Sequence, residues 1–288
     1  MDALQFLLSG LVVGSIYGLM GVGFTFIFNV TGIVNFAQGD FAMLGAMSTI
    51  ALATAGLPLW LAILLAIVIT AVIAALVERL AIRPVGQDVV RGIIVTIGIG
   101  VMIQGVAAVM WGTDAYPMPA FSGERPISIA NATITPQALW VIATMIVTMV
   151  FLELFFRRSF LGQMLRACAV NPFAARLVGL RVSTMSLISF IISGALGAIV
   201  GIVVAPISLT QYDSGLQLGI KGFIACIIGG FGGPVAAAAG GLMLGILEAF
   251  AAGYVSSAYK NAIAFVLLIA FLLFRPGGLF GEFEKTKG

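Results

Sequence analysis

Residues 32–46 read GIVNFAQGDFAMLGA, a glycine-rich stretch in which three polar side chains interrupt an otherwise apolar chain. These side chains, Asn35, Gln38 and Asp40, lie near the start of an apolar segment that extends over about 34–55. Glycine weakens a helix, and backbone polar groups in lipid must find partners inside the protein. We therefore expect a helix to break here, where protein or water surrounds the chain.

The composition of the whole chain is that of a membrane protein. Of its 288 residues, 61% are apolar and 9% are charged, whereas about 25% of the residues of a soluble domain are charged. Apolar runs of about 18 residues or more recur along the chain, which is typical of membrane-spanning helices. We predict an all-α fold, a polytopic bundle that forms a single transmembrane domain over residues 1–288.

About eight or nine membrane segments are expected. Two of them, at about 34–55 and 216–231, are interrupted by glycine and polar residues, and GIVNFA (32–37) weakly matches GIKGFI (219–224). Two diverged halves of a transporter would leave such a match, and interrupted segments at corresponding positions indicate a substrate path. The continuous segments lie at about 4–29, 58–78, 92–111, 137–156, 184–206, 235–253 and 259–274.

The distribution of basic residues predicts the orientation of the chain. Eleven of the fourteen Lys and Arg residues lie in 79–91, 157–183 and 275–287. All three regions fall on one side if the chain crosses nine times, and basic loops are cytoplasmic. We expect a multi-pass protein of the bacterial inner membrane, with the N-terminus outside and the C-terminus cytoplasmic. A segment that dips in and returns would break this parity.

Glycines at helical spacing indicate close contacts between helices. Small residues four positions apart share one face of a helix and allow two backbones to approach closely in lipid. We expect tight helix packing at Gly10, Gly14 and Gly18, at Gly197 and Gly201, and at Gly241 and Gly245.

The polar residues of the interrupted segments are the candidates for a solute path. Asn35 and Gln38 stand next to the expected break, whereas Asp40 either lines the path or caps the second helix near the lipid headgroups. Glu248 lies well inside an apolar run and should face the bundle interior, with Lys221 as its partner, in a structural or a substrate-binding role. The candidate path residues are Asn35, Gln38, Gly39, Asp40, Lys221, Gly222 and Glu248.

Several functional classes are excluded by what the chain lacks. It has no histidine, and its two cysteines, Cys168 and Cys226, are far apart with no C-x-x-C, so we expect no metal site and no catalysis. It also has no phosphate-binding loop, so any ATP and magnesium must bind other chains. The scattered positive charge gives no indication of nucleic-acid binding.

The basic segment 157–183 contains a capped helix. Asn171 is a favourable N-cap, Pro172 suits the first helical position and Gly179 suits the residue after the end. We therefore predict a short helix over 172–178. It is either a basic interfacial turn or a docking helix for a cytoplasmic partner.

Three stretches together resemble a known family. FAARLVG (173–179) resembles the E-A-A-x-x-x-G loop of ABC-importer permeases, with Phe173 in place of Glu. The opening stretch resembles the G-x-x-N-x-A-x-G-x-x-x-x-x-G segment of the LivH-type permeases of branched-chain amino-acid importers. Residues 219–248 resemble that family's G-x-K-[AG]-F…G-G-x-G…G-G-x-x-L-G-x-x-E run. The likeness covers essentially the whole chain, with the motifs in the family's order.

The resemblance implies an assembly. It pairs this subunit, itself not an enzyme, with a homologous LivM-type permease, two cytoplasmic ABC ATPases that bind ATP and magnesium, and a solute-binding protein outside. The residues that it places in a groove of the ATPase are Arg166, Asn171, Pro172, Phe173, Ala174, Ala175 and Gly179. Phe173 would there be an apolar anchor.

The expected function is ATP-driven import of a small solute by alternating access. The scarcity of buried charge favours a zwitterionic or neutral solute, above all a branched-chain amino acid. Two alternatives remain open. One is an ABC permease for urea or short amides, and the other is an ion-coupled secondary carrier, for which Asp40 and Glu248 are the only intramembrane carboxylates.

Overall fold

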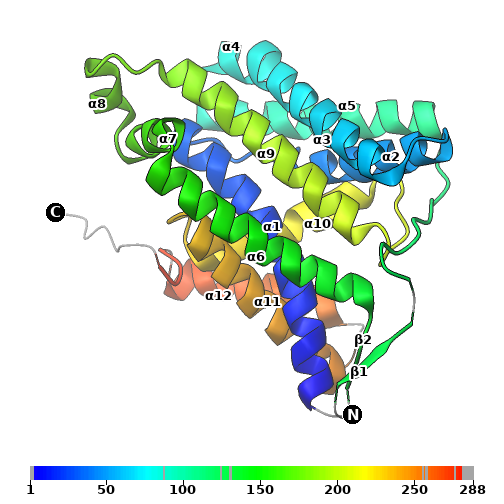
Figure 1. The fold of residues 1–288 in the computed structure, drawn as a ribbon. Coiled ribbons are helices and arrows are strands. Elements are labelled where there is room, and N and C mark those ends of the chain that lie inside the picture. The colour runs from blue at the N-terminus through cyan, green and yellow to red at the C-terminus, as the bar shows by residue number, and fades with distance from the viewer. Residues whose placement is uncertain are drawn as a thin grey trace.

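A computed structural model describes residues 3–86, 88–123, 125–129, 132–254, 256, 259–275 and 277–280. Most of this part of the chain is helical, which confirms the predicted all-α membrane bundle (Figure 1). The rest consists of turns, loops and a small antiparallel hairpin of β1 (Ile127–Ile129) and β2 (Ala132–Ile134).

The long helices coincide with the predicted continuous segments. Six helical stretches of the described chain are long and apolar enough to cross a membrane. The third predicted segment, α3 (Leu59–Val77), continues through a π-helical turn, η1 (Glu78–Ile82), into α4 (Arg83–Val85). The other long helices are α1 (Ala3–Thr31), α5 (Val89–Trp111), α6 (Pro136–Arg158), α9 (Val182–Val204) and α11 (Pro234–Tyr254).

The remaining helices are short. Helix α12 (Lys260–Phe274) is the last predicted segment, and α2 (Gln38–Thr54) and α10 (Ser214–Gly229) are the two segments predicted to be interrupted. Helices α7 (Phe160–Val170) and α8 (Pro172–Leu177) form the basic segment. Because α2, α10 and α12 are shorter than a typical span of about 20 residues, the count of nine crossings stays a prediction.

The bundle has two distinct ends (Figure 1). The basic end carries α4, α7, α8 and the end of α12. The loop end carries the start of α1, the β1–β2 hairpin and the loops 112–123 and 205–213, which pair through the backbones of Tyr116 and Thr210. The basic regions of the described chain therefore gather at one end of the bundle, and the start of α1 lies at the other. Which end faces the cytoplasm stays a prediction.

Glycine contacts hold α1 against α11 and α9 against α2. A Cβ atom on Gly241 or Gly245 would overlap the backbone of α1, and a Cβ atom on Gly201 would overlap the backbone of Ala42 in α2. The close helix packing predicted from glycine spacing is confirmed. This close packing brings the backbones of neighbouring helices so near to each other that lipid cannot enter between them.

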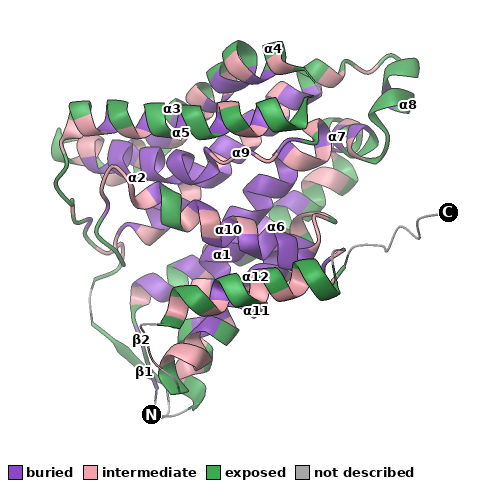
Figure 2. Ribbon diagram, turned by 180° about the vertical axis from the view of Figure 1, so that it is seen from behind, coloured by how far each residue is buried: buried purple, intermediate pink, exposed green. Residues whose placement is uncertain are grey.

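Helix α2 has no lipid-facing side over most of its length. Every residue from 38 to 50 is buried (Figure 2), because α3, α5, α9 and α10 surround the helix. By contrast, α3 exposes Trp60 and Val72 on its outward face. Protein enclosure explains how a helix that begins with Gln38 and Asp40 is stable at this position.

The second interrupted segment differs from the expectation. Helix α10 is continuous over Ser214–Gly229, and the irregular backbone follows it, where Gly230, Phe231 and Gly233 have positive φ angles of 98°, 52° and 137°. Its internal glycines serve close packing: a Cβ atom on Gly222 would overlap the side chain of Met20.

The predicted internal match between 32–37 and 219–224 is therefore wrong as a structural correspondence. Residues 32–37 are irregular, whereas residues 219–224 are helical. Helices α2 and α10 nevertheless contact each other, because Gly39 in α2 lies against the backbone of Gly215 in α10.

Replacement of Gly245 by Ala should lower the melting temperature of the purified protein, because the added methyl group has no space against α1. Overpacking of this kind costs about 1–3 kcal/mol. Gly105→Ala in α5 is the matched control: Gly105 is exposed with no atom near the position of a Cβ, and alanine favours a helix over glycine by up to about 1 kcal/mol. Equal thermal stability of the two variants would contradict the proposed α1–α11 contact.

Candidate functional site

The break between α1 and α2 is a partly buried, irregular segment whose backbone is hydrogen-bonded by side chains. Gly32, with a φ of 71°, ends α1. The Thr31 hydroxyl then accepts a hydrogen bond from the Ile33 N–H at 3.1 Å. Farther along, the Asn35 Oδ1 atom accepts one from the Ala37 N–H at 3.2 Å. These contacts replace the hydrogen bonds that a continuous helix would have made.

Thr96 of α5 provides the contact from outside the segment. Its hydroxyl accepts a hydrogen bond from the Phe36 N–H at 3.2 Å and lies 3.4 Å from the Val34 carbonyl, to which it can donate. The same hydroxyl lies 2.9 Å from the Ile93 carbonyl in its own helix. Thr96 thus binds α5 to the broken segment.

Gln38 binds α2 to α9. Its Nε2 atom donates to the Ser193 carbonyl at 3.0 Å, and its Oε1 atom accepts from the Ser193 hydroxyl at 2.6 Å. Gln38 and Asn35 are fully buried. Among the described residues, the Asn35 Nδ2 atom has no hydrogen-bond partner.

Asp40 lies in the first turn of α2, where the helix dipole favours a carboxylate. It is 3% exposed, and its Oδ1 atom accepts a hydrogen bond from Gln104 of α5 at 2.8 Å. Asp40 makes no capping hydrogen bond to the described backbone of α2, and burial inside the bundle replaces the expected headgroup environment. Its two alternative roles, path lining and helix capping, both stay predictions.

Lys221 and Glu248 form the predicted pair. The Lys221 Nζ atom lies 2.9 Å from the Glu248 Oε1 atom, and Glu248 is fully buried. A third residue, Lys260 at the start of α12, lies 3.8 Å from the same oxygen. Lys260 was not predicted, because a lysine at the end of an apolar run is usually an interfacial residue.

A cavity of about 670 Å³ at the loop end contains this pair. Helices α2 and α10 both line it: Ala42, Met43 and Ala46 come from α2, and residues 214–218 and Lys221 come from α10. Its charged lining residues are Asp213, Lys221, Glu248 and Lys260. The candidate residues therefore divide into two groups: Lys221 and Glu248 line the cavity, whereas Asn35, Gln38 and Asp40 do not and instead surround the start of α2.

The basic end contains the predicted capped helix. Helix α8 begins at Asn171, whose Oδ1 atom accepts a hydrogen bond from the Ala174 N–H at 3.0 Å, and Gly179 follows it with a φ of 87°. Helix α7 was not predicted, because its Leu165 and Cys168 face the protein within a sequence that is otherwise semi-polar.

Exposed apolar side chains cover α7 and α8. Phe173, Leu177 and Val178 are 70%, 74% and 76% exposed. Ala175, which also belongs to α8, is by contrast buried. The end of α6, α7 and α8 also enclose a groove of about 660 Å³ that is lined by Arg157 and Arg166. Contiguous apolar exposure outside the membrane helices indicates an interaction surface.

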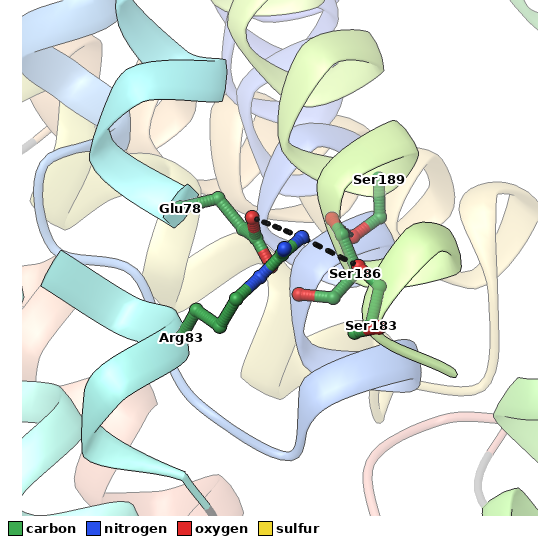
Figure 3. A network of polar contacts seen from close by, with 5 residues as sticks. All are labelled: Glu78, Arg83, Ser183, Ser186 and Ser189. Carbon is green, nitrogen blue, oxygen red and sulfur yellow. Dashed lines mark hydrogen bonds and ion pairs between the residues drawn. The ribbon is translucent and has the colours of Figure 1, made fainter. Parts of the chain in front are cut away.

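An ion pair between η1 and α4, with its carboxylate buried, is joined to the start of α9 by a hydrogen bond. Arg83 reaches between Glu78 and Ser183 (Figure 3), at 3.2 Å from the Glu78 carboxylate and 3.2 Å from the Ser183 carbonyl. Glu78 is 1% exposed. Glu78 and Arg83 are separated by five residues (i and i+5), a spacing that suits the wider π-helical turn of η1. Sequence analysis missed the pair because the α-helical rule considers i+3 and i+4.

Replacement of Thr96 by Val should lower the free energy of unfolding, because it leaves the Phe36 N–H without a partner in a buried segment. An unsatisfied buried donor costs about 1–3 kcal/mol. Thr70→Val is the matched control, since the buried Thr70 hydroxyl bonds only the Ala66 carbonyl four residues earlier in its own helix. Unfolding in mixed micelles measures both changes. A loss no larger for Thr96 than for Thr70 would show that α5 does not stabilise the break.

Comparison with known proteins identifies clear relatives. A family model described as "Branched-chain amino acid transport system / permease component" matches residues 6–272. The high-affinity branched-chain amino acid transport system permease protein LivH of Escherichia coli K12 is 31% identical over 99% of this chain and 97% of its own. The corresponding permease protein BraD of Pseudomonas aeruginosa is 32% identical over the same shares.

A solved structure shares the fold. PsaBC from Streptococcus pneumoniae in complex with Fab superposes with a TM-score of 0.52 over 96% of this chain and 93% of that chain. Its sequence identity of 11% supports the fold alone.

Proposed function

Because the chain belongs to the family of branched-chain amino acid transport permeases, we propose that it imports aliphatic amino acids as one permease subunit of an ABC transporter. The loop-end cavity is the observation that carries the choice of solute. Helices α2 and α10 line it, and it combines two cationic and two anionic side chains with an apolar wall. A small zwitterion matches such a lining in charge and in polarity.

The cavity also weighs against the alternative solutes and mechanisms. Urea and short amides carry no charge, so four charged side chains would be desolvated without compensation. An ion-coupled carrier would need a carboxylate relay, but Asp40 is bonded to Gln104 and does not line the cavity with Glu248. ATP-driven import therefore fits the arrangement best.

The proposed path uses the two groups of residues differently. Lys221 and Glu248 line the path itself. Asn35, Gln38 and Asp40 hold the start of α2 in place. Gly39 and Gly222 allow α2 and α10 to approach their neighbours.

The proposed assembly follows the family's division of labour. A second, LivM-type permease closes the open side of the cavity, a binding protein delivers solute at the loop end, and the basic end faces the cytoplasm. Two ATPases bind ATP and magnesium and dock on α7 and α8, where Phe173 is an apolar anchor and Arg166 contributes charge. The exposed apolar side chains of α8 support this surface.

Contacts between helices connect the docking surface to the cavity. Helix α8 is joined through Gly179 to α9, and Arg83 of α4 donates a hydrogen bond to the start of α9. Farther along, α9 packs on α2 through Gly201 and the Ser193–Gln38 hydrogen bonds. A displacement of α8 by the ATPases would therefore move α9 and then the α2 wall of the cavity.

Replacement of Phe173 by Ser should weaken ATPase binding while the protein still inserts. Loss of an interface anchor costs about 2 kcal/mol, which corresponds to roughly 30-fold weaker binding. Co-purification of the ATPases and ATP-dependent leucine uptake in proteoliposomes are the measurements. Val109→Ser is the control, since Val109 is also exposed but lies on α5 near the loop end.

Two results would contradict the proposed function. Wild-type ATPase binding by the Phe173 variant would move the docking surface elsewhere. Vanadate-insensitive leucine uptake by this chain alone would indicate a secondary carrier. The buried Ala175 is a poor site for this test, because a polar replacement there would disturb the packing of α8 itself.

A further inference from the structure

We infer that Asp213, Lys221, Glu248 and Lys260 form a binding site for the ammonium and carboxylate groups of a free α-amino acid, at the loop end of the bundle. The inference rests on the proposed function and assigns roles to individual side chains. Glu248 and Asp213 receive the α-ammonium group, and Lys260 with Lys221 receives the α-carboxylate.

Each carboxylate of the cluster has one oxygen atom for which the described residues provide no hydrogen-bond donor. Among the described residues, the buried side-chain atoms without a partner include Glu248 Oε2 and Asp213 Oδ1. Both residues line the same cavity. A buried acceptor without a donor is costly, and an ammonium group with three N–H donors is suited to satisfy two acceptors at once.

The lysines are placed to hold an anionic group without leaving Glu248 unpaired. Lys221 donates to the Glu248 Oε1 atom at 2.9 Å, so the pair persists without ligand. Lys260 lies 3.8 Å from that oxygen, and its side chain is 43% exposed. Because Lys260 is more accessible, it is free to turn toward a carboxylate that enters from the loop end.

The charges of the cavity select for a zwitterion. Its four charged side chains, two ammonium and two carboxylate groups, sum to zero at neutral pH. A zwitterionic ligand preserves that balance, whereas a cation or an anion adds a net charge inside a bundle where charge is poorly solvated.

The remaining wall of the cavity suits an aliphatic side chain. Ala42, Met43 and Ala46 of α2 lie on one side, and Val204 and Ala205 from the end of α9 lie beside them. The volume of about 670 Å³ is within the range of small-molecule sites, about 300–1,000 Å³. Polar recognition at one end and apolar contact at the other is the usual arrangement of such sites.

A packing role alone would not predict these features. An ion pair that serves only stability is expected to be enclosed and hydrogen-bonded at both carboxylate oxygens. Here one oxygen of Glu248 has no hydrogen-bond partner among the described residues, a second lysine lies beside the pair, and the group borders a cavity.

The test measures ligand binding by the assembled importer without its binding protein. Three probes are titrated: leucine, leucinamide, which lacks the carboxylate, and 4-methylpentanoate, which lacks the ammonium group. The wild-type complex should bind leucine at least tenfold more tightly than either analogue. Lys260→Gln should weaken leucine binding about tenfold and leave leucinamide binding unchanged, whereas Asp213→Asn should weaken binding of both leucine and leucinamide.

Controls keep the test independent of folding. Tyr259→Phe, next to Lys260 but exposed and not among the residues that line the cavity, should bind leucine as the wild type does. The double variant Lys221→Met/Glu248→Gln removes both charges of the pair, so neither partner is left buried alone, and it should lose the preference for leucine over the analogues.

The outcomes separate this inference from the proposed function. If Lys260→Gln and Asp213→Asn import leucine with the wild-type KM, or if the wild-type complex binds all three probes alike, the site assignment is overturned while the importer stands. If the wild-type complex imports no leucine, the proposed function fails first.

Discussion

The structure depends on satisfying the backbone of an irregular segment inside a membrane bundle. In hydrocarbon each open N–H or C=O group costs several kcal/mol, so residues 32–37 can leave the helix only where side chains replace the lost hydrogen bonds. Thr31 does so from the end of α1, Asn35 from within the segment, and Thr96 from α5. This requirement explains why α2 is enclosed by other helices and why the neighbouring helices approach it through glycine.

Buried charged side chains also need partners inside the bundle, but one of them is only partly paired. Glu78 and Asp40 are buried and have partners, Arg83 and Gln104, which connect neighbouring helices. Glu248 also has a partner in Lys221, but one of its oxygens accepts no hydrogen bond from the described residues and it borders a cavity. Buried ion pairs contribute little net stability, so an incompletely paired one beside a cavity is better explained by ligand binding than by folding.

The helix contacts also give the chain a route for mechanical coupling. The docking helix α8 is connected to α9 through Gly179, and α9 contacts α2 through a glycine crossing and a hydrogen-bonded side chain. Rigid helices joined in this way transmit a displacement without local unfolding. The proposed ATPase surface and the cavity lie at opposite ends of this route, as an importer powered from the cytoplasm requires.

Apolar runs, capping residues and glycine spacing are local signals, and the sequence by itself determined the features that follow from them: the helical segments, the α8 helix with its Asn171 cap and the close packing at Gly241 and Gly245. The pairing of Lys221 with Glu248 was also predictable, because two opposite charges at apolar positions must meet. Other features depend on contacts between distant segments. The continuity of α10, the Ser193 partner of Gln38 and the inclusion of Asp213 and Lys260 in the cavity were decided only by tertiary structure. A glycine or a lysine at such a position has the same local preference whether a neighbouring helix approaches it or not, and only the packed bundle supplies that neighbour.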